Sequence, residues 1–117
     1  ARTNSIAELV DIYPTLCELT AGESPTHLQG NSLVSALESP DEIFKNRALA
    51  RYQKGETLIV DQLFYTEWQQ KGKVVSKMLY NHETDPNETI NLANDPAYLS
   101  IVKGLSQQLE QFKMTFN

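Results

Sequence analysis

Met78-Leu79-Tyr80-Asn81-His82-Glu83-Thr84-Asp85-Pro86-Asn87-Glu88-Thr89-Ile90-Asn91-Leu92-Ala93 is the stretch around which the chain is organised. Its first residues alternate as in a strand, which puts Met78, Tyr80 and His82 on one face and Leu79 and Asn81 on the other. The rest of the chain falls on either side of this stretch: the residues before it build toward the strand, and those after it form a helix.

The second half of the stretch predicts a turn and an anchored loop. Pro86 has no N–H for a strand ladder and biases Asp85 away from helix, so strand pairing must stop there. Ile90 and Leu92 are the apolar residues of the loop that follows, and we expect both to anchor it. We also expect Tyr80 and Leu92 to be buried between the sheet and the C-terminal helix.

The residues before and after this stretch predict a sheet and a helix. Runs of β-branched and aromatic residues separated by polar turns are typical of strands; we expect strands at 48–52, 57–60, 63–68 and 74–82. Asp95 and Pro96 fit the cap and first position of a helix over 95–114. Its apolar residues recur at helical spacing: Tyr98, Ile101, Val102, Leu105, Leu109 and Phe112.

The N-terminal region predicts helix followed by a connector. Residues 5–21 have helical periodicity, but Pro14 favours two segments, the second capped by Asp11. Ser5 and Glu8 fit a capping box.

In the connector, residues 23–46, Gly30 is expected at a positive φ, a short helix is expected to end near Leu37, and Ile43 and Phe44 are expected to act as anchors. Cys17 has apolar neighbours and no basic residue nearby, which favours a buried, inert thiol over a nucleophile.

Together these elements predict an α+β fold: a small antiparallel sheet of about four strands, a C-terminal helix packed on one face, and an N-terminal helical segment. We divide the chain into residues 1–46, the helical segment and connector, and residues 47–117, the sheet and helix. The 117 residues are 40% hydrophobic and carry a net charge of −5 without a basic run, which argues against a nucleic-acid partner. No apolar run approaches the ~20 residues that span a bilayer.

The organising stretch resembles the C-terminal signature of type I sulfatases, L-Y-D-hydrophobic-x-x-D-P-x-E-x-x-N-L-A. The matching residues are Leu79, Tyr80, Asp85, Pro86, Glu88, Asn91, Leu92 and Ala93. Asn81 departs from the usual Asp, and His82 resembles the iduronate-sulfatase-like branch. The segment FYTEW at 64–68 resembles the same branch, except that Phe64 stands where that branch has Arg. The segment AELVDIYPTLCELTAG at 7–22 is similar to a second sulfatase pattern, in which Asp11 is a helix cap. The chain thus resembles the C-terminal subdomain of a sulfatase, with residues 1–46 leading out of the catalytic domain.

This resemblance implies an alkaline-phosphatase-like parent enzyme that hydrolyses sulfate esters of sulfated sugars or glycosaminoglycans. It implies bound calcium and a formylglycine nucleophile made in a C/S-x-P-x-R motif, and a periplasmic or secreted bacterial protein. That motif is absent here, since Cys17 is followed by Glu18, Leu19 and Thr20. The two histidines and the single aspartates lack metal-ligand spacing. We therefore expect no catalytic residue, no metal ligand and no cofactor in this chain.

A few residues are candidates for contact with substrate. Arg51, Tyr52 and Lys54 lie near where the resembled branch carries S-Q-Y-P-R, and a cation there could meet an acidic sugar or sulfate; the alternative is a solvated loop. His82 is weighed as a hydrogen-bonded scaffold residue or a base, and Trp68 as packing or a sugar platform.

The functional interpretation is the inactive C-terminal region of a sulfatase, which could line the outer substrate pocket and which packs on the parent's catalytic domain. Cut from that domain, the chain should expose apolar surface and self-associate. The alternative is a free-standing α+β protein-interaction module.

Overall fold

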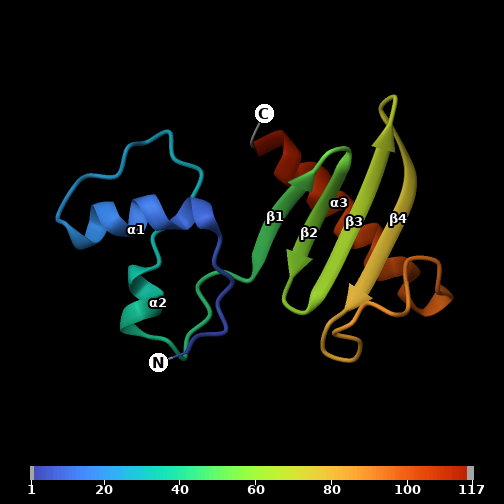
Figure 1. The fold of residues 1–117 in the computed structure, drawn as a ribbon, viewed down its shortest axis with the longest axis horizontal. Coiled ribbons are helices and arrows are strands. Elements are labelled where there is room, and N and C mark those ends of the chain that lie inside the picture. The colour runs from blue at the N-terminus through green and yellow to red at the C-terminus, as the bar shows by residue number, and fades with distance from the viewer. Residues whose placement is uncertain (1, 116–117) are drawn as a thin grey trace. The chain divides into compact units, whose positions relative to one another are not determined.

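The computed structural model describes residues 2–115 (Figure 1). By contacts, the chain divides into two compact units, one that ends at Ala48 and one that begins at Leu49. In chain order the elements are the 3₁₀ turn η1 (Leu9–Asp11), α1 (Ile12–Leu19), α2 (Val34–Glu38), β1 (Arg47–Tyr52), β2 (Gly55–Val60), β3 (Leu63–Gln70), β4 (Lys73–Asn81), the 3₁₀ turn η2 (Pro96–Tyr98) and α3 (Leu99–Thr115).

The strands form a four-stranded sheet in the order β1-β2-β3-β4, with antiparallel pairing from β2 to β4. The register aligns Leu58 with Tyr65 and Tyr65 with Leu79, so three large side chains fall in one row. α3 runs across this face of the sheet (Figure 1). The predicted α+β fold of about four strands and a C-terminal helix is therefore confirmed.

The core lies between this row and α3. Leu58, Tyr65, Leu79 and Leu109 are fully buried, and further apolar residues pack around them: Ala93, Val102, Leu105, Leu49, Val60, Leu63, Leu92, Tyr98 and Phe112. The helical stripe predicted for 95–114 is confirmed, apart from Ile101, which is exposed. Asp95 caps the turn as predicted, because its carboxylate accepts a 2.9 Å hydrogen bond from the amide of Ala97.

The strand prediction chose the wrong core face for β4. Leu79 is fully buried, whereas Tyr80 is half-buried and lies on the opposite face, paired with Phe64. Alternation along a strand allows one of the two neighbours to face α3, and Leu79 takes that place. In the following loop Leu92 packs against the core as an anchor, as predicted, but it is half-buried and not fully buried as expected. Ile90, the second expected anchor, is exposed.

The predicted helix start at Ser5 is wrong. The Ser5 hydroxyl donates to the carbonyl of Glu42 and accepts from the amide of Phe44, so it ties the N-terminal segment to the connector instead of capping a helix. The short helix predicted in the connector is present as α2. The expected anchors Ile43 and Phe44 are both exposed. Cys17 is half-buried, not fully buried as expected.

Gly30 does not have the positive φ that we expected. Its backbone instead lies so close to the chain at η1 that an added Cβ would fall 1.9 Å from the carbonyl oxygen of Val10. Glycine is needed at position 30 for this close approach and not for a left-handed turn.

Candidate functional site

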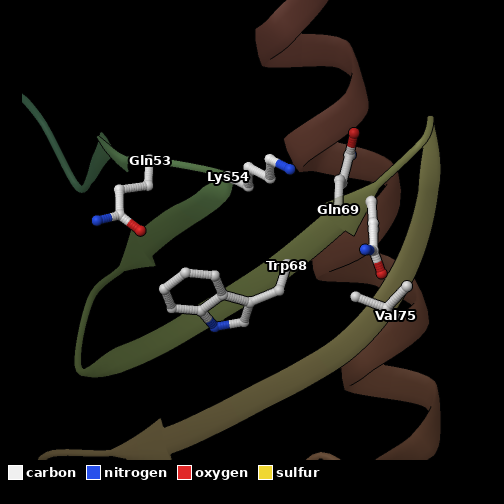
Figure 2. Close-up of a pocket in the computed structure, with 6 residues that line it drawn as sticks. Gln53, Lys54, Trp68, Gln69 and Val75 are labelled. Carbon is white, nitrogen blue, oxygen red and sulfur yellow. The ribbon is translucent and has the colours of Figure 1, made fainter.

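An open pocket of about 690 Å³ lies at the end of the sheet where the β1–β2 turn meets the β3–β4 hairpin (Figure 2). Its lining residues are Gln53, Lys54, Trp68, Gln69, Gln70 and Val75. All of them belong to the unit that begins at Leu49. The pocket is thus built within one compact unit, from two adjacent turns and the strands that carry them.

The floor of the pocket is the indole of Trp68. Trp68 pairs with Gly55 across β2 and β3, and a Cβ added to Gly55 would meet three indole carbons at 3.1–3.2 Å. The missing side chain therefore lets the ring lie over the strand. Trp68 follows the buried Glu67 on β3, so alternation points it to the sheet face away from α3, and it remains half-exposed.

A β-bulge in β4 shapes the wall of the pocket on that strand's side. Trp68 pairs with Ser76 and Gln69 pairs with Val74, which leaves Val75 as an extra residue in β4. A bulge bends its strand and redirects one side chain. Here it brings the exposed Val75 to the pocket beside Trp68 (Figure 2).

The rim of the pocket is polar. Gln53 sits in the β1–β2 turn at a φ of 52°, and the amide of Gln69 donates a 3.0 Å hydrogen bond to the carbonyl of Lys54. This bond fixes the turn to β3. Four polar residues are among those that line the pocket, and they supply three carboxamides and one ammonium group. Gln69 follows Trp68 on β3, so alternation directs it to the α3 side of the strand, and Figure 2 shows Lys54 and Gln69 on that side of the indole.

The charge at this end of the unit is positive. Lys54 is joined by Lys71 and Lys73 at the hairpin tip, and residues 53–55 and 69–76 contain no Asp or Glu. No ion pair of the three lysines is found within residues 2–115. The nearby carboxylates Glu56 and Glu67 instead point to the α3 face, where each has partners.

The four residues predicted to contact substrate do not form one site. Lys54 lines the pocket, whereas Arg51 forms a 2.7 Å ion pair with Glu56 and Tyr52 is 72% exposed. His82 lies 2.8 Å from a Glu88 carboxylate oxygen. Their contact with substrate stays a prediction.

His82 has a second contact that fits the scaffold interpretation. Its ring stacks on Phe64 with the centroids 3.7 Å apart and the planes 17° from parallel. The Asp85 carboxylate accepts hydrogen bonds from the backbone of Thr89 and Ile90, and these bonds fix the turn beside His82. The same bonds lower the pKa of the Asp85 carboxyl. His82 is thus held between an aromatic ring and a carboxylate.

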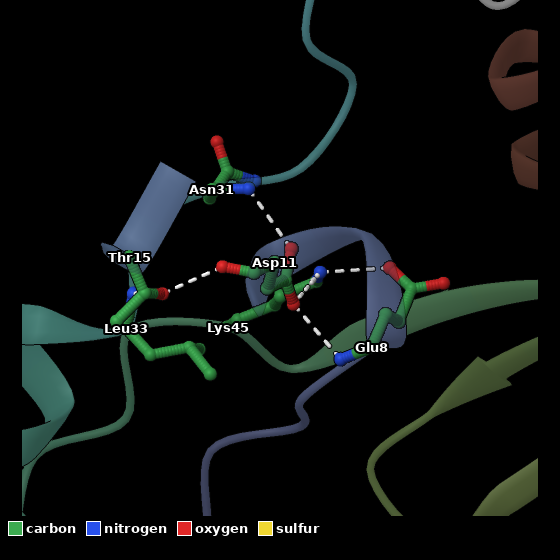
Figure 3. A network of polar contacts seen from close by, with 6 residues as sticks. All are labelled: Glu8, Asp11, Thr15, Asn31, Leu33 and Lys45. Atoms are coloured by element: carbon green, nitrogen blue, oxygen red, sulfur yellow. Dashed lines mark hydrogen bonds and ion pairs between the residues drawn. The ribbon is translucent and has the colours of Figure 1, made fainter. Parts of the chain in front are cut away.

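A second polar cluster surrounds Asp11 in the unit that ends at Ala48 (Figure 3). The buried carboxylate accepts hydrogen bonds from the backbone amides of Glu8 (2.8 Å) and Asn31 (2.9 Å) and from Lys45 (2.6 Å). Thr15 donates to the Asp11 carbonyl and accepts from the Leu33 amide.

Asp11 is the N-cap residue of α1 as predicted, but its side chain does not cap that helix, because it bonds to no amide of α1. Burial alone would raise the pKa of Asp11, but the hydrogen bonds from Lys45, Asn31 and Glu8 outweigh it and lower that pKa. Lys45 in turn has a raised pKa, because its bonds to Asp11 and Glu8 outweigh its burial. All of these partners satisfy one another, so the cluster is structural.

Two carboxylates attach α3 to the sheet. Burial opposes ionisation of Glu56, but ion pairs with Lys113 at 2.8 Å and Arg51 lower its pKa. Glu67 accepts hydrogen bonds from Tyr65 (2.8 Å) and from Ser106 on α3 (2.5 Å). Burial and this carboxylate raise the pKa of Tyr65 above its ordinary value.

Residues 2–115 contain no group of three or more His, Cys, Asp or Glu side chains placed to hold a metal ion. Within the same residues, no helix combines the length and the apolar character needed to cross a membrane.

The sequence interpretation missed most of the pocket. Gln53, Gln69, Gln70 and Val75 were not singled out, and Trp68 was named as packing or as a sugar platform without a partner. A signal for the glutamines was present, since two of them precede the polar hairpin tip. No signal pointed to Val75, because a bulge depends on how two strands pair.

Comparison with known proteins gives one family for nearly the whole chain. The model of the family described as "N-sulphoglucosamine sulphohydrolase, C-terminal" matches residues 1–115. A sulfatase of Formosa agariphila is 27% identical over 111 residues, which cover 94% of this chain and 21% of that protein.

Solved structures share the fold. One is BT4656 in complex with its substrate D-glucosamine-2-N,6-O-disulfate, with a TM-score of 0.81 and 20% identity over 91% of this chain and 24% of that one. Another is BT1596, a 2-O glycosaminoglycan sulfatase, with a TM-score of 0.75 and 24% identity over the same shares. The chain therefore spans about a fifth to a quarter of the length of the proteins it matches.

Proposed function

Because the chain belongs to the N-sulphoglucosamine sulphohydrolase C-terminal family, and so is the C-terminal region of a sulfatase, we propose that its parent enzyme hydrolyses sulfate esters of sulfated sugars, including glycosaminoglycans. The observation that carries this proposal is the family match over residues 1–115. The sulfated amino sugar bound by one fold relative and the glycosaminoglycan activity of another support the substrate class.

Within that enzyme, this region is a scaffold and not the catalytic centre. The sequence lacks the C/S-x-P-x-R motif, and the described residues offer no cluster that fits calcium. The nucleophile and the calcium ligands then belong to the catalytic domain of the parent sulfatase. This region packs on that domain. Its own contribution is to hold side chains, such as Lys54, beside the outer part of the substrate.

Two narrower features belong to the same proposal. His82 and the segment at 64–68 support the iduronate-sulfatase-like group, in which Arg51, Tyr52, Lys54 and His82 would be the outer contacts. A periplasmic or secreted location follows from the same resemblance.

The experiment is to express the complete reading frame and measure sulfate release by ion chromatography. D-glucosamine-2-N,6-O-disulfate and heparin-derived disaccharides are the substrates, and residues 1–117 alone are the comparison. We expect release by the complete protein and none by the isolated chain. No release from any of these substrates would contradict the proposal. A start codon at residue 1, with no C/S-x-P-x-R motif upstream, would favour the free-standing interaction module.

A further inference from the structure

The pocket around Trp68 has the chemistry of a saccharide site. A pyranose ring has an apolar face of C–H groups, and the half-exposed indole over Gly55 offers a flat apolar surface of matching kind. Gln53, Gln69 and Gln70 carry carboxamides that can both donate to and accept from sugar hydroxyls. An aromatic surface with carboxamides near it can therefore contact the apolar face of a sugar ring and hydrogen-bond to its hydroxyls.

The local charge identifies which saccharides fit. Lys54, Lys71 and Lys73 lie at this end of a chain whose net charge is −5, and no carboxylate accompanies them within 53–55 and 69–76. Neither the pocket nor the hairpin tip offers them an ion-pair partner among the described residues. Sulfate and carboxylate groups are the ligands that such ammonium groups attract.

The pocket also has the construction of a formed site. The bulge at Val75 and the glycine under the indole both depart from regular strand structure, and both departures open space next to Trp68. Bulges of this kind occur next to active sites, where they redirect a side chain.

We propose that this pocket binds an anionic saccharide unit: its ring stacks on Trp68, and Lys54, with the hairpin lysines, neutralises its sulfate or carboxylate. The inference rests on the proposed function, because it makes the pocket a subsite for a remote unit of the same sulfated glycan. Such a subsite serves an oligosaccharide and is not used by a monosaccharide.

The test measures binding and turnover in the complete protein. A heparin-derived tetrasaccharide and its desulfated counterpart are titrated by isothermal calorimetry, and KM and kcat are measured for the tetrasaccharide and for D-glucosamine-2-N,6-O-disulfate. Trp68→Ala removes the floor, Trp68→Phe keeps a ring, and Trp68→Leu keeps apolar bulk without one. Lys54→Gln removes the charge, with Lys103→Gln on α3 as its matched control.

We expect Trp68→Ala and Trp68→Leu to weaken tetrasaccharide binding at least tenfold, and Trp68→Phe to weaken it less. Lys54→Gln should weaken binding several-fold and reduce its salt dependence, while Lys103→Gln should change nothing. KM for the tetrasaccharide should rise in Trp68→Ala, with kcat and the monosaccharide kinetics unchanged. The desulfated tetrasaccharide should bind more weakly than the sulfated one.

Unchanged tetrasaccharide affinity in Trp68→Ala would overturn the inference, as would a loss of melting temperature without a loss of affinity. Failure of the wild-type protein to bind the tetrasaccharide would overturn it as well. Sulfate release from the tetrasaccharide with an unaltered KM in Trp68→Ala would leave the proposed function standing without the pocket. Trp68-dependent binding without any sulfate release would instead support the pocket and contradict the proposed hydrolysis.

Discussion

In the unit that ends at Ala48 the largest fully buried side chain is a carboxylate, Asp11, while in the unit that begins at Leu49 the buried row is Leu58, Tyr65, Leu79 and Leu109. Many large apolar residues of the first unit are exposed instead of buried. Leu9 is 86% exposed, and exposed neighbours accompany it along α1: Ile12, Tyr13, Leu16 and Leu19. The first unit is thus held by polar bonds around one charge, and the second by apolar packing.

Helical periodicity alone therefore does not locate a core. The spacing of apolar residues in α1 is as regular as that in α3, yet only the α3 stripe is buried within its unit. A unit organised by hydrogen bonds concentrates its stability in a few directed contacts. An apolar core spreads stability over many contacts, so the two units should respond differently to substitution and to acid.

The largest effect is expected for Asp11→Ala. The change leaves Lys45 and the amides of Glu8 and Asn31 without their shared acceptor, and breaking a buried ion pair costs about 3–5 kcal/mol. Hydrogen exchange should show lost protection in α1 and its surroundings, while β2–β4 keep theirs. Asp41→Ala, which removes an exposed aspartate of the same unit, should be neutral. Unchanged exchange in Asp11→Ala would show that the first unit does not depend on this charge.

A comparable or slightly smaller loss is expected for Leu79→Ala. Leu79 is fully buried, and truncation of a core leucine costs about 2–5 kcal/mol. Protection should fall in the sheet and in α3, and the denaturant midpoint of that unit should drop. Leu99→Ala, at a largely exposed position of α3, is the control. If α1 lost protection to the same extent, the two units would be one cooperative structure and the comparison would fail.

A smaller effect is expected from acid. The pKa of Asp11 is lowered from its ordinary 3.8, so its contribution to stability is complete above the unfolded value. That contribution is lost as the pH falls from about 4 through the folded pKa, because the unfolded chain then binds the proton more readily. The first unit should therefore lose exchange protection below pH 4 in wild type, and Asp11→Asn should remove this dependence. The pKa of Glu56 is also lowered, so the stability of the second unit should fall with pH in the same direction. Glu56 lies outside the apolar core of that unit.

The smallest effect distinguishes two residues of the organising loop. Leu92 is half-buried against the core, so Leu92→Ala should cost about 1–2 kcal/mol. Ile90 is 63% exposed, and Ile90→Ala should cost less than about 0.5 kcal/mol. Urea denaturation of both variants measures the difference. Equal midpoints would show that the loop is not anchored through Leu92.

Features set by local pattern were predictable from the sequence, and features set by distant partners were not. The four strands, the Asp95 cap and the α3 stripe depend on neighbouring residues. The choice of Leu79 over Tyr80 depends on which sheet face α3 covers, which alternation cannot tell. The wider bonding of Asp11 could not be predicted, because two partners of its carboxylate lie 20 and 34 residues away.

The same reasoning explains the site. Lys54 was predictable as an exposed cation in a turn, but the pocket beside it depends on the pairing of Gly55 with Trp68 and on the bulge at Val75. Both depend on the register in which the strands pair, and that register cannot be deduced from the sequence pattern of a single strand.

The side chain of Asn91 bonds to the backbone of β4, which forms an edge of the sheet. Its side chain accepts from the amides of Leu79 (3.0 Å) and Ala93 (3.0 Å) and donates to the carbonyl of Lys77 (3.1 Å), while the amide of Leu92 donates to the carbonyl of Leu79 (2.8 Å). One asparagine and the next backbone amide thus occupy edge groups of β4 that a further strand would use. An exposed edge is a template for pairing with other chains. The Asn-Leu-Ala sequence therefore blocks part of the β4 edge, so that those backbone groups cannot pair with the strand of another chain.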